Sequence, residues 1–152
     1  MNRFALLNLM LALLLTTSFA TASYGDDKLV LKRLEEKGAK VTAVKEQLQI
    51  AVGECSQWTD EDFKSLGSVA NVTSLSFGLG FNESSLPLLA GLKDLESFGS
   101  NGMQITDEGL KTFTQFPKLK RLTFFHPPRS FSGKTLAQLA VLKQFEELSI
   151  GG

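Results

Sequence analysis

The stretch ITDEGLKTFTQFPKLKRLTF, residues 105–124, contains two apolar periods in succession. Its apolar residues recur every three positions from Leu110 to Leu122 and then alternate with polar ones up to Phe124. The first spacing is typical of a helical segment with one buried side, and the alternation is typical of a short strand with one buried face. Thr106 stands where a hydroxyl oxygen can accept from the free N–H groups of a first helical turn. Residues 105–124 therefore predict a helix followed by a strand.

The same helix–strand unit occurs four times between residues 58 and 152. The four units begin with an apolar residue followed by a side-chain oxygen, at Trp58-Thr59, Phe81-Asn82, Ile105-Thr106 and Phe131-Ser132. Each is predicted to end in a strand whose last inward residue is Phe77, Ser100, Phe124 or Ile150. Equivalent positions lie 23, 24 and 26 residues apart, counted along Leu66, Leu89, Phe113 and Leu139. A period of this length predicts an α/β solenoid with a short parallel sheet on its concave side and helices on its convex side.

The third unit carries the resemblance to a known family. Ile105, Thr106, Asp107, Gly109 and Leu110 resemble the repeats of bacterial leucine-rich-repeat proteins of the I-T-D-x-G-L type. A looser copy consists of Trp58, Thr59, Asp60 and Phe63. The resemblance implies a horseshoe-like array and a binding or scaffolding role. The family has no common catalytic residues, so the resemblance implies no enzymatic activity.

Residues 1–22 have the pattern of a cleaved signal peptide. Arg3 precedes an apolar run from Phe4 to Leu15, and Ala20-Thr21-Ala22 supplies small residues in front of Ser23. A transmembrane anchor is the alternative, but the run is shorter than the roughly 20 residues that span a membrane. The pattern predicts export to the periplasm, the cell surface or the medium after cleavage near Ala22-Ser23.

Residues 23–57 are predicted to form an N-terminal cap on the four repeats of residues 58–152. The cap would contain a helix from Lys28 to Lys37, ended by Gly38, and a first strand at Gln47–Ile50. At the other end the sequence stops just after the strand 148–150. Three explanations stay open: a short protected edge, pairing with a second chain as a homodimer, or a shortened relative of longer arrays.

The amino-acid composition of the chain limits the classes of function that can be expected. The chain has one cysteine, Cys55, and one histidine, His126, so no internal disulfide and no two-histidine metal site is expected. Cys55 is expected to be a small buried residue, with an intermolecular crosslink or a reactive thiol as the alternative. A G-x-S-x-G motif is absent, and no catalytic residue, metal or cofactor is predicted. With 16 basic and 16 acidic residues, the chain gives no reason to expect nucleic acid or, after signal removal, a membrane as partner.

The outward strand positions are small and weakly polar except in the third unit. The predicted partner-binding residues there are Arg121, Thr123, Phe125, His126 and Arg129. Aromatic and arginine side chains dominate binding hot spots. The alternative is that Phe125 packs beneath the Pro127-Pro128 loop. The sequence thus predicts a secreted or periplasmic binding or scaffolding module for a protein partner, with a structural, self-associating cell-envelope protein as the alternative.

Overall fold

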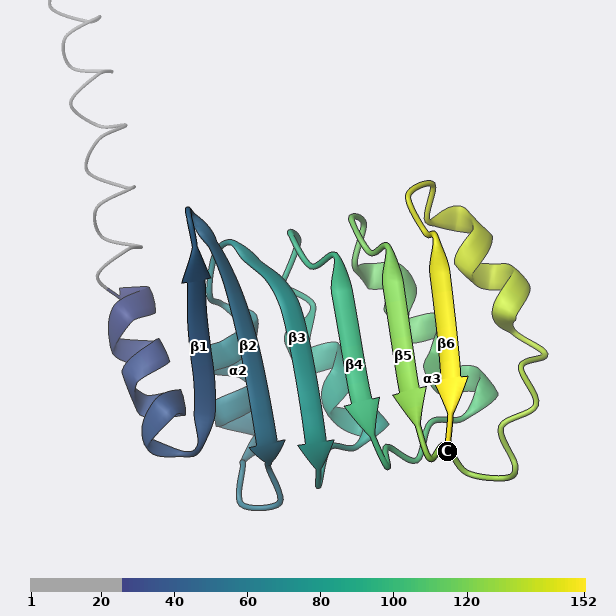
Figure 1. The fold of residues 1–152 in the computed structure, drawn as a ribbon, viewed down its shortest axis with the longest axis horizontal. Helices are drawn as coiled ribbons and strands as arrows, with labels where there is room; N and C mark the ends of the chain where they lie inside the picture. Colours follow the sequence, from purple (N-terminus) through teal and green to yellow (C-terminus); the bar gives the residue numbers. More distant parts are fainter. Residues whose placement is uncertain (1–25) are drawn as a thin grey trace, which may run out of the picture.

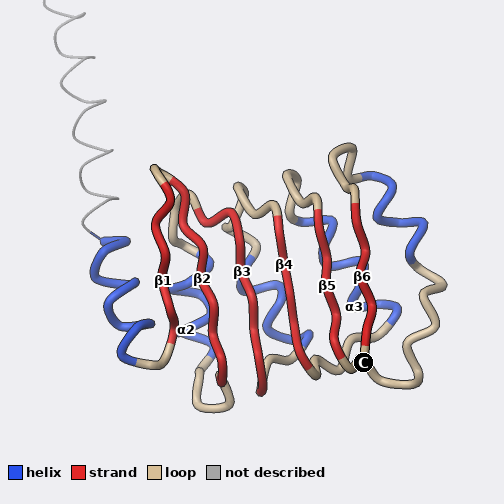
Figure 2. The backbone as a smooth tube through the Cα atoms, viewed as in Figure 1, coloured by secondary structure: helices blue, strands red, loops and turns tan. Residues whose placement is uncertain are grey.

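The computed structural model describes residues 26–152, which form a mixed α/β structure with one six-stranded sheet. The strands lie side by side in chain order, and the helical segments cover one face of the sheet (Figure 1). Figure 2 shows the same two layers, with the strands in red and the helices in blue. The predicted signal peptide, residues 1–22, lies outside the described residues. No helix of residues 26–152 is long and apolar enough to cross a membrane.

The strand connections explain why the sheet is mostly parallel. The strands are β1 (Ala39–Val44), β2 (Gln47–Glu54), β3 (Val72–Leu79), β4 (Ser97–Asn101), β5 (Arg121–Phe125) and β6 (Glu147–Gly151). β1 and β2 form an antiparallel hairpin, and every later pair is parallel because a helical segment returns the chain to the starting edge. A sheet of mainly parallel strands with helices on one face is therefore confirmed.

The helical segments differ in length and type. They comprise the N-terminal helix (residues 26–36), α2 (Asp60–Gly67), η1 (Glu83–Leu89), α3 (Asp107–Lys111), η2 (Thr112–Gln115) and η3 (Leu136–Val141). Only α2 and the N-terminal helix are regular α-helices of two turns or more; η1, η2 and η3 are 3-10 helices. Pro87 inside η1 has no N–H to donate, which disfavours an α-helix there.

The core lies between the sheet and the helical layer. Leu75, Phe98 and Leu122 occupy equivalent inward positions on β3, β4 and β5 and are fully buried. Ser100 is 3% exposed, and its hydroxyl has no hydrogen-bond partner. Met103, two residues after β4, is also buried.

Two of the four side-chain oxygens that begin the units do not cap a helix. The Thr106 hydroxyl accepts from the Gly109 N–H at 3.0 Å, and Thr59 donates to the Asp62 carboxylate from both its N–H and its hydroxyl. Asn82 precedes η1 but does not cap it with its side chain. Ser132 is not a cap either, because η3 begins at Leu136, four residues later, after Thr135. The longer connection of the fourth unit delays its helical turn.

Two apolar residues of the fourth unit are exposed. Ile150, which is predicted to point inward, is 47% exposed, and Leu136 is 36% exposed. Ile150 does point to the helix side, because it lies beside the buried Phe124 in the sheet register. Within the described residues, however, β6 has a neighbouring strand on one side only. Ile150 therefore has less covering than Phe124, which has a strand on both sides.

The beginning of the sheet also differs from the prediction. β1 was not predicted, although Ala39, Val41 and Ala43 alternate and lie beside Val52, Ile50 and Leu48 of β2. Lys45, with φ of 58°, forms the turn between the two strands. In addition, alignment of the strands by their sequence pattern places Gln47 beside Ser74 on the outward face. In the structure Gln49 is the residue beside Ser74, so the alignment of β2 is wrong by two positions.

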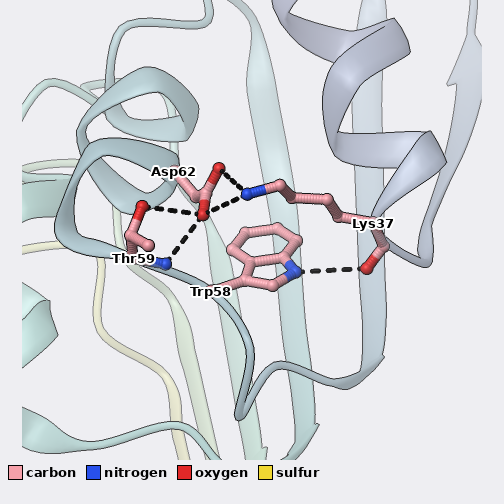
Figure 3. A network of polar contacts seen from close by, with 4 residues as sticks. All are labelled: Lys37, Trp58, Thr59 and Asp62. Atoms are coloured by element: carbon pink, nitrogen blue, oxygen red, sulfur yellow. Dashed lines mark hydrogen bonds and ion pairs between the residues drawn. The ribbon is translucent and has the colours of Figure 1, made fainter.

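A polar network joins the N-terminal helix to the first repeat unit (Figure 3). Lys37 Nζ lies 2.7 Å from both carboxylate oxygens of Asp62, and the Trp58 indole N–H donates to the Lys37 carbonyl at 3.2 Å. Burial opposes the charged form of Asp62, but the hydrogen bonds from Lys37 and Thr59 outweigh it and lower the pKa of this carboxyl below 3.8. The network holds the cap against the start of α2.

The burial of each leucine predicts how much its truncation lowers the free energy of unfolding. We expect Leu122→Ala to lower the free energy of unfolding by about 2 to 5 kcal/mol, because Leu122 is fully buried and the truncation leaves a cavity. Leu136→Ala, the matched control at a partly exposed leucine, should cost far less. Urea unfolding followed by circular dichroism measures both. Equal effects of the two changes would contradict the inward register of β5.

The lowered pKa of Asp62 predicts an acid-sensitive contact. Because the folded-state pKa lies below the unfolded value, the charged carboxylate stabilises the fold above that unfolded value and loses this contribution as the pH falls through the folded pKa. The stability advantage of the parent chain over Asp62→Asn should thus be constant above about pH 5 and shrink below it. Thermal unfolding over this pH range measures the advantage.

The control for this experiment is Asp60→Asn, which removes a charge from the same helical turn without breaking the contact to Lys37. The same pH dependence in both variants would show that general charge effects, rather than the Lys37–Asp62 pair, are responsible.

Candidate functional site

β5 places three of the five predicted binding residues on one face. Arg121, Thr123 and Phe125 alternate with the buried Leu122 and Phe124, so they lie on the face of the sheet opposite the helices, here called the open face. The Phe125 side chain is 49% exposed. The prediction that Phe125 points outward is confirmed, and the alternative that it is buried beneath the Pro127-Pro128 loop is wrong.

The residue after β5 has an unusual backbone conformation. Each parallel strand from β3 to β6 is followed by a residue with positive φ, and in three of the four units this residue is a glycine: Gly80, Gly102 and Gly152. In the third unit it is His126, with φ of 54°. A side chain in this left-handed region costs roughly 1 to 2 kcal/mol, and such strain clusters at functional sites.

Two contacts hold His126 in this conformation. Its N–H donates to the Gly151 carbonyl at 2.8 Å, and its Nδ1 atom lies 3.0 Å from Oδ1 of Asn101. Asn101 and Phe125 are register partners on β4 and β5. His126 therefore connects the ends of three neighbouring strands: its backbone N–H bonds to β6, its imidazole contacts β4, and it directly follows β5.

Glycine at the next strand leaves room for the Phe125 ring. A Cβ atom at Gly151 would lie 3.3 Å from two carbons of this ring, closer than an ordinary contact. A larger residue at 151 would require the ring to shift. The Phe125 ring thus lies close to the backbone of Gly151.

The charges around Phe125 have both signs. Arg121 is exposed at the start of β5 and is the register partner of Glu147 on β6. Arg129 is exposed in the connection between β5 and η3. Among the described residues, Arg129 forms no hydrogen bond or ion pair with the other four predicted residues. The structure therefore brings Arg121, Thr123, Phe125 and His126 together on or directly after β5, whereas Arg129 lies in the following connection and is not bonded to them.

Asn101 is a member of this cluster that was not predicted. Its position at the end of β4 was visible in the sequence, because the outward strand positions of consecutive units can be aligned. The contact of Asn101 with His126 was not visible in the sequence, because this contact depends on the left-handed backbone conformation of His126. The signal that would have indicated it is that His126 replaces the glycine that follows the other parallel strands.

The chemistry of the described residues is limited. No group of three or more histidine, cysteine, aspartate or glutamate side chains in residues 26–152 is arranged to hold a metal ion. Cys55 is buried, as expected, and its thiol donates to the Leu79 carbonyl. Burial, together with the charge of Glu54, raises the pKa of this thiol to about 11, so it stays protonated at neutral pH.

Two clefts among residues 26–152 lie away from Phe125 and His126. The larger, of about 550 Å³, is lined by residues of the N-terminal helix, the β1–β2 turn and the α2–β3 connection. The smaller, of about 230 Å³, lies at the amino-terminal ends of the strands, next to the ion pair of Asp94 and Lys118. Phe125 and His126 lie at the carboxyl end of β5, on an exposed surface.

No protein-family model and no curated protein sequence matches this chain. The candidate site, defined by Asn101, Arg121, Thr123, Phe125 and His126, therefore rests on geometry and chemistry alone.

The backbone strain at His126 can be measured with two substitutions. We expect His126→Gly to be more stable than His126→Ala by about 1 kcal/mol, because only glycine adopts a positive φ without a steric cost. Both variants lose the contact with Asn101, so their difference isolates the backbone. Chemical unfolding of the two variants gives this difference. Equal stabilities would show that residue 126 is not held in the left-handed region.

Proposed function

We propose that the chain is an exported leucine-rich-repeat solenoid that binds a protein partner through the open face of β5. In this proposal the four units and their cap form a rigid support, and the candidate site, which extends along the open face of β5 and includes Asn101 at the end of β4, makes the specific contacts. Catalysis, a cofactor and a metal have no part in it. Residues 1–22 serve as the signal for export.

The observation that carries the proposal is the exposed Phe125 next to the strained His126. An aromatic ring that is half exposed buries apolar area on contact at little conformational cost. His126 has a positive φ at a register position where the second and fourth units have Gly102 and Gly152. Backbone strain at an exposed aromatic residue favours a binding role over a structural one.

The surroundings of Phe125 favour a protein over a small ligand. Six open-face residues lie beside β5, and four of them are small: Ser97, Gly99, Ser149 and Gly151. These four do not project far enough to block an approaching surface, and the other two are Asn101 and Glu147. Arg121 lies on the same face of β5 as the Phe125 ring and supplies positive charge. An aromatic ring and an arginine on one accessible sheet face match the composition of binding hot spots in protein interfaces.

The proposal predicts which substitutions weaken binding. A partner recovered by affinity capture from the source cell should lose at least about thirtyfold in affinity with Phe125→Ala or Arg121→Ala, because removing a central anchor costs about 2 kcal/mol or more. Isothermal titration with the purified partner measures this loss. Thr123→Ala should have a smaller effect, since its side chain is shorter and half-buried.

The control is Lys111→Ala on the opposite, helical side of the sheet. Lys111 forms an ion pair with Glu108 in the same helix. We expect the Lys111→Ala substitution to leave binding unchanged. A loss with Lys111→Ala, together with full binding by the Phe125 and Arg121 variants, would move the interaction surface to the helical layer and contradict the proposal.

A further inference from the structure

At the edge of β6 that faces away from β5, the positions of the backbone N–H and C=O groups restrict how another strand can pair with β6. Glu147 donates its N–H to the Lys120 carbonyl, and the Gly151 carbonyl accepts from His126, so both residues face β5. Because successive residues of a strand point their backbone groups to opposite sides, Ser149 also faces β5. The N–H and C=O groups of Leu148 and Ile150 therefore point away from β5, to the edge that has no neighbour among the described residues.

Exposed apolar side chains gather at the same end of the structure. Seven large apolar residues are exposed among residues 26–152, and three of them, Leu136, Val141 and Ile150, belong to the fourth unit. Val141 is the most exposed of the seven, at 67%. η3, which carries Leu136 and Val141, lies at this end, beyond β6 in the view of Figure 1. An uncovered strand edge and an uncovered apolar surface thus coincide.

We propose that a second copy of this chain pairs with β6 in an antiparallel arrangement centred on Ser149. Leu148 of each copy then lies opposite Ile150 of the other, and each such pair exchanges two backbone hydrogen bonds through the groups that face the edge. The two apolar side chains of each pair meet on the helix side. Glu147 lies opposite Gly151, so no like charges face each other.

The neighbouring registers are less favourable. Centring the pair on Leu148 would require Glu146, whose N–H already donates to the Lys120 carbonyl. Centring it on Ile150 would require Gly152, whose φ of 116° is not that of an extended strand. Only the register centred on Ser149 uses β6 residues alone. A two-fold pairing of this kind also closes on itself, so it produces a dimer and not a fibre.

The dimer leaves the candidate functional site accessible. β5, which carries Arg121 and Phe125, is separated from the new edge by β6, and its open face is not covered by an in-plane extension of the sheet. Self-association through β6 is therefore independent of the proposed protein-binding function, and either proposal can fail without the other.

A cysteine at position 149 tests the register directly. In the proposed dimer the two Ser149 residues face each other as a non-hydrogen-bonded pair, with Cα atoms about 4.5 Å apart, within the range of about 4.4 to 6.8 Å that a disulfide spans. Ser149→Cys in the purified chain should form a disulfide-linked dimer under mild oxidation. Non-reducing electrophoresis measures the rate, and Cys55, which is buried, gives a low background in the parent chain.

The matched control is Glu147→Cys. Its two copies would lie four residues apart along the paired strands, about 13 Å at 3.4 Å per residue, and cannot form a disulfide without disrupting the pairing. Crosslinking should be several-fold faster at position 149 than at position 147. Equal or faster crosslinking at position 147 would overturn the register.

Light scattering tests the dimer itself when a charge is introduced at position 149, which lies on the two-fold axis of the proposed dimer. The parent chain and Ser149→Asn should be dimers, and Ser149→Asp should be a monomer with an unchanged circular dichroism spectrum, since it places two carboxylates directly opposite each other. Proline at 149 is unsuitable, because it would remove an N–H that faces β5. A parent chain that is monomeric at every concentration, or a dimer that survives Ser149→Asp, would overturn the proposal.

Discussion

The register between neighbouring parallel strands is the constraint on which the rest of the structure depends. Leu75, Phe98 and Leu122 lie side by side, and so do Phe77, Ser100 and Phe124. A slip of one residue would move these side chains to the open face and bring Ser76 or Thr123 into the core. The buried rings form a continuous series across the units: Phe77 stacks on Phe81 with ring centres 4.1 Å apart, and Phe98 contacts Phe113 at 4.9 Å. Each unit thus fixes the position of the next.

Carboxylates in the first helical turns connect one unit to another and reinforce this register. Glu83 of the second unit accepts from the N–H and the hydroxyl of Thr106 in the third unit. Asp107 of the third unit accepts from the Ser132 hydroxyl of the fourth, which holds the pKa of this carboxyl below its ordinary value. Acidic residues at a helix start favour the helix by charge alone, but here the same side chains also bind the adjacent unit. This second role explains why Ser132 is used as a donor and not as a cap.

The candidate functional site arises where the repetition is broken. The third unit keeps the inward pattern but places Phe125 and His126 where neighbouring units have small residues or glycine. The core tolerates this change because both side chains point away from it. A repeated support with one altered unit separates the residues that maintain the fold from those available for recognition.

Much of this fold was predictable from local patterns. The three-residue spacing followed by alternation located β3, β4, β5 and β6 and the residues that face the helices, because each unit repeats the same signal. The outward direction of Arg121, Thr123 and Phe125 followed from the two-residue period of a strand. The spacing could not indicate β1, since an antiparallel hairpin before the first unit interrupts the repeat.

By itself the sequence determined which side of each strand faces the core, because that choice depends only on the alternation of apolar residues. Whether such a residue is actually buried was decided by the tertiary structure: Ile150 follows the same pattern as Phe124 but is half exposed, since β6 has a neighbouring strand on one side only among the described residues. The contact between His126 and Asn101, 25 residues apart in the chain, was likewise decided by the packing of adjacent strands. The physical reason is that period and polarity are local properties, whereas burial and the pairing of distant side chains depend on the stacking of whole units.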